Sequence, residues 1–319
     1  MKRFVRFVAA FAASALSVAT ADAAPLLGPP RIFAPGVISG AANDGAPTVS
    51  PDGKTLLFTR SGAGAGAILE SHLIAGRWSP PRIAAFSGTW NDQHAAFSPD
   101  GRYVVYVSIR RVGHTKKAYA HLYRVDRTAS GWSAPALLPV AVNIGPAIFK
   151  PSVASDGSIY FLSIGTGHKL QMYRSSRRDG TYLAARRLPF SVEANADVDP
   201  EIAPDQSFLV LASSGRSSKD DAKEHLFIVF NRGGSWGAVQ RIRYVGDDAN
   251  GSSNDNEPDL GPDGRTLYFS SDRSPALHFP RSRAQALADE ARIEAWDNGS
   301  TNVWTLDIGA LVKNARRAS

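Results

Sequence analysis

PTVSPDGKTLLFT (residues 47–59) is a sequence pattern that this 319-residue chain contains five times, with variations. Pro presets φ for the first position of a β-turn, and Asp and Gly tolerate the conformations that follow. Apolar, β-branched and aromatic residues flank the turn on both sides, so each copy predicts a β-hairpin. The other copies are AAFSPDGRYVVYV (95–107), PSVASDGSIYFLS (151–163), PEIAPDQSFLVLA (200–212) and PDLGPDGRTLYFS (258–270), and the turn aspartates are Asp52, Asp100, Asp156, Asp205 and Asp263.

Each repeat is long enough for more than a hairpin, because successive turn aspartates are 48 to 58 residues apart. A third strand follows in every repeat, and in the first four a second turn and a fourth strand come after it, as in GRWSPPRIAAF (76–86). Four antiparallel strands form a propeller blade. The sequence therefore predicts an all-β fold, a five-bladed β-propeller of four-stranded antiparallel blades. The third strands are AILESHLIA (67–75), AHLYRVDR (120–127), LQMYRSSR (170–177), HLFIVFNR (225–232) and NVWTLDIG (302–309).

The fifth repeat has no fourth strand of its own, because the chain ends soon after residue 309. The string GPPRIF (28–33) near the start of the chain resembles SPPRIAAF (79–86), which is the fourth strand of the first repeat. A ring of blades is closed by pairing its two ends, since open ends would leave bare strand edges. We therefore expect residues 29–33 to complete the last blade. The alternative is six blades, with one degenerate blade within 271–301.

The first residues have the features of a secretory signal peptide. Lys2, Arg3 and Arg6 precede an apolar run that is too short to span a bilayer, and Ala21-Asp22-Ala23 matches a cleavage site. We expect a signal peptide over 1–23, cleavage after about Ala23, and a location in the periplasm or outside the cell. The chain has no cysteine and a net charge of +7, and no stretch of its sequence resembles a basic groove with interleaved aromatic residues. This argues against thiol chemistry and nucleic acid, and we expect a monomer without a transmembrane segment.

The repeats resemble the TolB-like β-propeller repeat, a WD-type repeat of exported bacterial proteins with the pattern P-x-[VFIL]-S-P-D-G-[KR]-x-[LV]-[YV]-F. Copies one, two and five match well, whereas copy three has Ser155 in place of Pro and copy four has Gln206 in place of Gly. The resemblance implies a propeller that docks envelope proteins through its face and channel mouth. The motif itself describes a turn, so it carries little information on function.

The remaining segments predict a single propeller domain over 24–310 with one insertion. Residues 275–300 form a longer connection than its counterparts, and the capping box Ser282-x-x-Gln285 predicts a helix over about 283–296. We expect this helix to lie over the variable-loop face as a lid, with coverage of the blade-five edge as the alternative. Residues 311–319 are expected to be a C-terminal tail.

Alignment of the repeats places polar residues on the innermost strands, which surround the central channel. The positions three, five and seven residues before the turn share one side of a strand by period two. The short turns define one face of the disc, the turn face, and the longer connections define the variable-loop face, where we expect the binding site. The candidate ligand-binding residues are Asp44, Asp92, His94, Lys150, Asp197, Asp199, Glu201, Asp255, Glu257, Asp259, Arg216 and Arg273.

Blades four and five together contribute six of these carboxylates, which would repel one another without a positive partner. The alternatives are a Ca²⁺ or Mg²⁺ ion, a basic loop of a partner, or the chain's own cations. The candidate metal ligands are Asp199, Glu201, Glu257 and Asp259, and the loop arginines that could neutralise acids or hold an anionic sugar are Arg60, Arg110, Arg111, Arg216 and Arg273.

Catalytic motifs are poorly represented, so we assign no catalytic residue. His94 stands near Asp92, where a general base could lie, but a polar channel histidine satisfied by a neighbour is the simpler interpretation. We therefore expect a binding scaffold for an envelope protein, a peptide or a small ligand. The alternative is a hydrolase or lyase that acts on a carbohydrate through channel carboxylates such as Asp199 and Glu257, by analogy with other five-bladed propellers.

Overall fold

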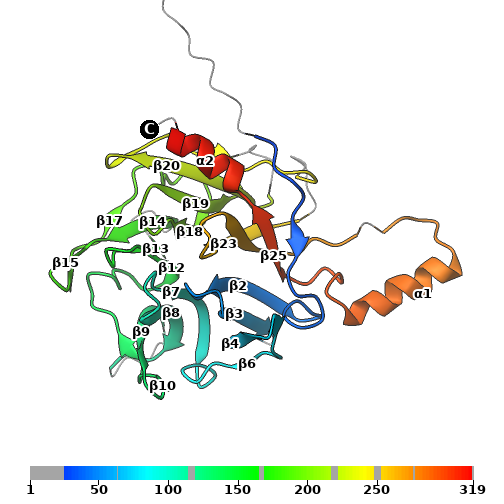
Figure 1. Ribbon diagram of the computed structural model, residues 1–319, viewed down its shortest axis with the longest axis horizontal. Helices are drawn as coiled ribbons and strands as arrows, with labels where there is room; N and C mark the ends of the chain where they lie inside the picture. Colours follow the sequence, from blue (N-terminus) through cyan, green and yellow to red (C-terminus); the bar gives the residue numbers. More distant parts are fainter. Residues whose placement is uncertain are drawn as a thin grey trace, which may run out of the picture.

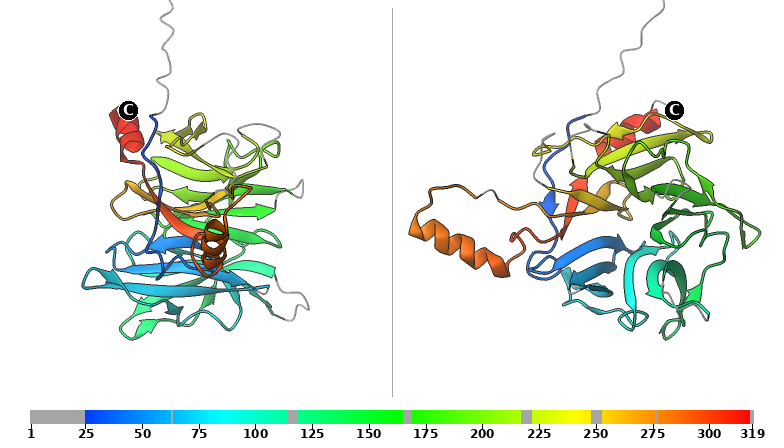
Figure 2. Two further views of the ribbon diagram at one scale, coloured as in Figure 1. Left: turned by 90° about the vertical axis from the view of Figure 1, so that its right-hand side faces the viewer. Right: turned by 180° about the vertical axis from the view of Figure 1, so that it is seen from behind.

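The computed structural model describes residues 25–62, 64–113, 119–164, 169–216, 222–247, 253–275 and 277–317, which form antiparallel sheets around a central axis (Figure 1). The sheets are the blades of a five-bladed β-propeller, as the repeats predict. Seen from the side, the blades form a disc (Figure 2). The signal peptide expected over 1–23 lies outside the described residues.

Blades one, two and four have the same construction: three long strands, followed by two outer strands of two residues that both pair with the third long strand. Blade one contains β2 (Asn43–Val49), β3 (Thr55–Gly62), β4 (Ala65–Ile74), β5 (Arg77–Trp78) and β6 (Arg82–Ile83). Blade two contains β7 (Asn91–Phe97), β8 (Tyr103–Arg110), β9 (Tyr119–Thr128), β10 (Gly131–Trp132) and β11 (Ala136–Leu137). Blade four contains β18 (Asp197–Ile202), β19 (Phe208–Ser213), β20 (His225–Arg232), β21 (Ser235–Trp236) and β22 (Gln240–Arg241).

Blade three has four paired strands and, beside them, a small separate hairpin at the rim. The four strands are β12 (Ile148–Val153), β13 (Ile159–Ile164), β14 (Leu170–Ser175) and β17 (Arg186–Arg187), and the hairpin consists of β15 (Arg177–Arg178) and β16 (Thr181–Tyr182).

Blade five is completed by the N-terminal strand, as predicted. Its strands are β23 (Asp255–Leu260), β24 (Thr266–Ser271), β25 (Asn302–Asp307) and β1 (Arg31–Ile32). Arg31 lies opposite Thr305 in an antiparallel pair, and the Phe33 N–H donates to the Val303 carbonyl at 2.9 Å. The described residues of 272–301 contain no strand, which excludes a sixth blade there.

The core consists of apolar clusters between neighbouring blades, and each cluster joins strands of two adjacent sheets. Between blades one and two, for example, Leu57 and Ile68 pack with Val104, Tyr106 and Val125, all of which are buried. Burial of such surface stabilises by about 25 cal/mol per Å². The ring is therefore held together by the blade interfaces, and this fixes the innermost strands around the channel.

The inserted helix α1 (Arg283–Ala291) has the predicted capping box, since the Ser282 side chain accepts from the Gln285 N–H at 3.2 Å. The helix is shorter than expected because the chain tightens into a 3₁₀ turn, η1 (Arg292–Glu294). Helix α1 projects sideways from the rim and buries no residue, so the expectation of a lid over the channel is wrong (Figures 1 and 2). Arg292 forms ion pairs with Asp289 and Asp297, so these contacts stay within the insertion.

The chain ends in a helix where we expected a tail. Helix α2 (Gly309–Arg317) starts after blade five, and the Asp307 side chain accepts the Gly309 N–H at 2.8 Å. Leu311 and Val312 are each 5 % exposed and pack into the cluster between blades four and five. This apolar pair anchors the helix. Over the part of the chain that the structure describes, no helix has the length and apolar character needed to cross a bilayer.

Candidate functional site

In four of the five repeats an aspartate stands seven residues before the turn, and each of these aspartates is already bound by an arginine of its own blade. Asp44, Asp92, Asp197 and Asp255 are at most 1 % exposed, and each lies within 3.2 Å of a guanidinium nitrogen. The expectation that loop arginines could neutralise channel acids is confirmed for these four pairs. A buried carboxylate held in this way serves the blade and offers little to a ligand. The pairs are Asp44–Arg60, Asp92–Arg110, Asp197–Arg216 and Asp255–Arg273.

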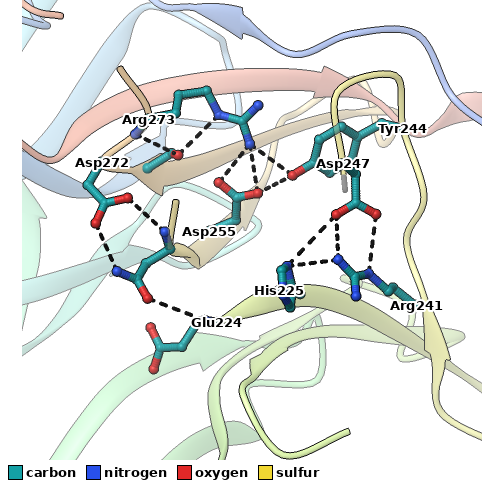
Figure 3. A network of polar contacts seen from close by, with 10 residues as sticks. Glu224, His225, Arg241, Tyr244, Asp247, Asp255, Asp272 and Arg273 are labelled. Atoms are coloured by element: carbon teal, nitrogen blue, oxygen red, sulfur yellow. Dashed lines mark hydrogen bonds and ion pairs between the residues drawn. The ribbon is translucent and has the colours of Figure 1, made fainter. Parts of the chain in front are cut away.

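The blade-five pair belongs to a larger network that the sequence did not predict (Figure 3). Arg273 contacts both Asp255 oxygens, at 2.9 and 2.8 Å, and the Tyr244 hydroxyl at 2.9 Å. Tyr244 in turn donates its O–H to Asp255. Burial and the charge of Asp255 raise the pKa of Tyr244. In the same connection, the Asp247 side chain is 4 % exposed and accepts from Arg241 at 2.6 Å. The network fixes the connection between blades four and five.

A β-bulge interrupts every innermost strand, and it changes how the channel is lined. The pairing register shifts between the residues six and three before each turn, in all five blades. The residue five before the turn has a positive φ of 42 to 56°, which costs non-glycine residues roughly 1–3 kcal/mol. Simple alternation along the strand, which we assumed from the sequence, is therefore wrong. The bulged residues are Ala46, His94, Lys150, Asp199 and Glu257.

The signal for this bulge was present in the sequence. Proline stands four residues before the turn in copies one, three, four and five. Because proline has no N–H to donate to the ladder, it is tolerated within sheets mainly at edges and bulges. The bulge also turns backbone N–H groups towards neighbouring blades: Ala46 donates to Glu257 at 2.7 Å, and Glu257 donates to Asp199 at 3.2 Å.

His94 and Glu257 meet across the channel, although they come from blades two and five, which are not neighbours in the ring. His94 Nε2 lies 2.9 Å from Glu257 Oε1. Burial would raise the pKa of Glu257, but the hydrogen bonds from His94 and Ser270 and the charges of His94 and Lys150 lower it to about 2. Burial and the charge of Glu257 raise the pKa of Asp199 to about 7. The Glu257 carboxyl group is therefore ionised, whereas that of Asp199 holds its proton up to about neutral pH.

The residues three before the turn link each innermost strand to the next. Glu201 accepts the Leu260 N–H at 3.1 Å, and Asp259 accepts the Val49 N–H at 3.2 Å, so both acids bridge adjacent blades. Thr48 and Ser152 do the same with the N–H groups of Phe97 and Ile202. Only blade two breaks this pattern among the five repeats, because Ala96 has no side-chain acceptor.

Lys150 is the cation at the centre of this acidic channel. It is fully buried, and its Nζ has no hydrogen-bond partner among the described residues. Burial raises the pKa of Glu201 and, with the charge of Glu201, that of Asp259; the Lys150 charge lowers both. It also lowers the pKa of Asp199 and Glu257. Lys150 thus balances four carboxyl groups without a direct bond to any one of them.

The candidate metal site is not assembled in the form that we expected. Within the described ranges, no three His, Cys, Asp or Glu side chains come together in a way that could hold a metal ion. Each of the four candidates already accepts a backbone N–H group. The donors are Glu257 for Asp199, Leu260 for Glu201, Ala46 for Glu257 and Val49 for Asp259. Binding of Ca²⁺ or Mg²⁺ in the channel stays a prediction.

Cavities lie at both ends of the channel, and they differ in chemistry. On the variable-loop face, a polar cavity of about 190 Å³ is lined by His94, Glu257 and Asn256, with residues of blade one. On the turn face, a cavity of about 380 Å³ has the buried acids Glu201 and Asp259 in its wall. Its apolar lining includes one residue from each blade, namely Val49, Phe97, Val153, Ile202 and Leu260. The turn face, which we expected to be structural only, therefore has a cavity of its own.

No protein-family model matches the chain, and no curated protein matches it. Solved structures with a similar fold include a TolB protein from Agrobacterium tumefaciens, with 22% identity, a TM-score of 0.47 and coverage of 72% of this chain and 70% of that one. TolB from Acinetobacter baumannii has 16% identity, a TM-score of 0.48 and coverage of 82% and 53%. The α-L-arabinofuranosidase PaAbf62A from Podospora anserina has 13% identity, a TM-score of 0.47 and coverage of 89% and 94%. These likenesses carry no information on the activity of this chain.

Proposed function

We propose that the protein is a binding scaffold whose channel receives a short segment of a partner, such as an envelope protein or peptide. The observation that supports this most is the turn-face cavity, where five apolar side chains surround two buried acids. Largely apolar pockets with a few convergent polar groups are the usual form of a binding site. A segment with an apolar side chain next to a cationic group would match both parts of this cavity.

The variable-loop mouth is the second place for a ligand, as the sequence analysis expected. Its polar lining, with His94 and Glu257, suits a small polar ligand such as a carbohydrate better than an apolar side chain. The turn-face cavity is larger and pairs apolar with acidic groups, so we favour it for a protein segment. In the bacterial envelope, to which the expected signal peptide would direct the chain, such a scaffold would assemble with other exported proteins.

A glycan hydrolase or lyase is the alternative, because Asp199 and Glu257 have pKa values of about 7 and about 2, a separation found in acid–base pairs. Two observations weigh against it. Asp199 lines neither channel cavity. Among the described residues, the cavity beside Glu257 has no Phe, Tyr or Trp side chain in its lining on which a sugar ring could stack. The difference between the pKa values of Asp199 and Glu257 is better explained by the burial of both groups next to each other.

The two cavities can be tested separately by substitutions that place an arginine side chain in each of them. Ser155 is an exposed turn residue in the lining of the turn-face cavity, and Thr301 lines the variable-loop cavity. We expect Ser155→Arg to abolish capture of a partner from envelope extract by the immobilised protein, while Thr301→Arg retains it. Capture that is unaffected by both variants, or no specific capture by the unmodified protein, would contradict the proposal. Release of reducing sugar from envelope glycans, lost in Glu257→Gln, would favour the enzyme instead.

A further inference from the structure

The outer edge of blade three carries a concentration of arginines that the channel does not explain. A groove of about 900 Å³ lies between β15 and β17 of this blade and the β21 turn of blade four. Strands β15 and β17 lie at the rim of the disc (Figure 1). Of the residues that the structure describes, Asp156 is the one carboxylate in the lining of the groove. The arginines that line the groove are Arg174, Arg177, Arg178, Arg186 and Arg187.

Two of these arginines lie directly opposite each other. Arg174 on β14 pairs in register with Arg186 on β17, and like charges in such positions destabilise a sheet. Blade one has the same strand pairing, but there Glu70 stands opposite Arg82. The same position thus holds a complementary pair in one blade and a repulsive pair in another. A bound anion would remove this repulsion.

The groove keeps a positive charge because, among its described lining residues, one acid faces five arginines. Asp156 accepts the Ser158 N–H at 2.8 Å and the Gln206 amide at 3.0 Å, and Arg174 lies 3.4 Å away. Within the described ranges, the side chains of Arg178, Arg186 and Arg187 make no hydrogen bond or ion pair, and all three are exposed. Their guanidinium groups are therefore available to a ligand.

The inner arginines are held in place by aromatic rings. The Arg174 guanidinium lies 5.6 Å from the centre of the Tyr160 ring, and that of Arg177 lies 5.8 Å from the centre of the Tyr182 ring. Such contacts orient a guanidinium through its face. Arg174 also donates to Asp156 at 3.4 Å and to Ser158 at 3.3 Å, so the outer arginines offer more free N–H groups to a carboxylate. Part of the ordering that binding would require is thus already present in the free protein.

We propose that this groove binds an acidic peptide segment of a partner protein. The carboxylates of such a segment match the arginines, and the apolar parts of the lining, among them Leu183, Pro189 and Trp236, leave room for apolar side chains between the acids. A flat lipid surface would reach the exposed arginines but not fill a groove, and a single phosphate would engage only part of it. The groove lies at the rim, so this contact is separate from the proposed channel function.

The test measures binding of a fluorescent decapeptide of alternating Glu and Leu to the mature protein by anisotropy at 50 mM salt. Arg186→Ala combined with Arg187→Ala is expected to raise Kd by about five- to ten-fold, because two exposed ion pairs are lost. Arg82→Ala is the matched control, since Arg82 occupies the same strand position in blade one, and we expect it to leave Kd within about two-fold. All variants are first checked for an unchanged melting temperature.

Four outcomes would overturn the proposal. The first is that the peptide does not bind, and the second is that Arg82→Ala raises its Kd as much as the groove variant does. The third is that Ser155→Arg abolishes peptide binding, which would place the peptide in the channel. The fourth is that anionic lipid vesicles or a sulfated polysaccharide displace the labelled peptide at a lower charge concentration than the unlabelled acidic peptide does.

Discussion

Replacement of Lys150 by Met is the change that bears most strongly on the acidic channel. The side chain is fully buried, so Met of similar length can occupy its place while the charge is removed. Four carboxyl groups then remain around the site, those of Asp199, Glu201, Glu257 and Asp259, and their pKa values are no longer lowered by this cation. Each must either ionise in a buried place or hold its proton more tightly.

The expected loss is large. Removal of one partner from a buried ionic group costs about 3–5 kcal/mol, because the remaining charges are left uncompensated. For a domain of this size, that corresponds to a fall in melting temperature on the order of 10 °C. The loss should be smaller at pH 5 than at pH 8, because Asp199, with a pKa of about 7, is already protonated at pH 5.

Thermal unfolding at pH 5 and pH 8 measures both effects, with Lys54→Met as the control. Lys54 is exposed in the turn of blade one, so its replacement removes the same charge and should change stability by less than about 0.5 kcal/mol. If Lys150→Met melts like the unmodified protein at pH 8, or loses the same amount at both pH values, then Lys150 does not balance the channel acids.

Three further experiments address other contacts. Ala96→Ser supplies the acceptor that blade two lacks for the Val153 N–H, and should raise the unfolding free energy in urea by about 0.5–1.5 kcal/mol. Arg186→Glu turns the repulsive pair with Arg174 into an attractive one and should stabilise by about 0.2–1 kcal/mol at low salt. For the unmodified protein, the raised pKa of Asp199 means that the folded chain binds more protons than the unfolded chain, so its contribution to stability should be lost as pH rises from about 4 to about 7.

Each of these experiments has an internal comparison. Ser152→Ala removes the acceptor of the Ile202 N–H and should destabilise where Ala96→Ser stabilises. Arg82→Glu would place two acids opposite each other at Glu70 and should destabilise, so equal effects of Arg82→Glu and Arg186→Glu would refute the charge argument. For the pH dependence, Asp199→Asn should flatten the decline between pH 4 and 7, and an unchanged slope would show that another group causes it.

The blade count and the closure by residues 29–33 could be predicted because both rest on local repeats in the chain. The positions of single acids could also be aligned, since each repeat supplies its own reference turn. What could not be predicted depends on contacts between blades: His94 reaches Glu257 across the ring, and Tyr244 joins the Asp255 pair from a loop. The bulges were missed because we assumed that side chains alternate between the two sides of each innermost strand along its whole length.

The two helices show the same limit. The capping box at Ser282 predicted the start of α1, but its direction depends on what the helix can pack against, and Leu287 stays 55 % exposed. Helix α2 was missed because, among its described side chains, two anchor it to the core, those of Leu311 and Val312, too few for a recognisable pattern.

The most direct test of the ring closure is a disulfide between its first and last strands. The chain has no cysteine, so Arg31→Cys with Thr305→Cys introduces one defined pair, at positions that lie directly opposite in the antiparallel ladder. Opposite residues have Cα atoms about 4.5–5.5 Å apart, within the range that a disulfide spans. The closed ring predicts that this pair oxidises within one molecule while Arg31→Cys with Thr128→Cys, on blade two, stays reduced. Free thiols in the first variant, or crosslinks only between molecules, would contradict it.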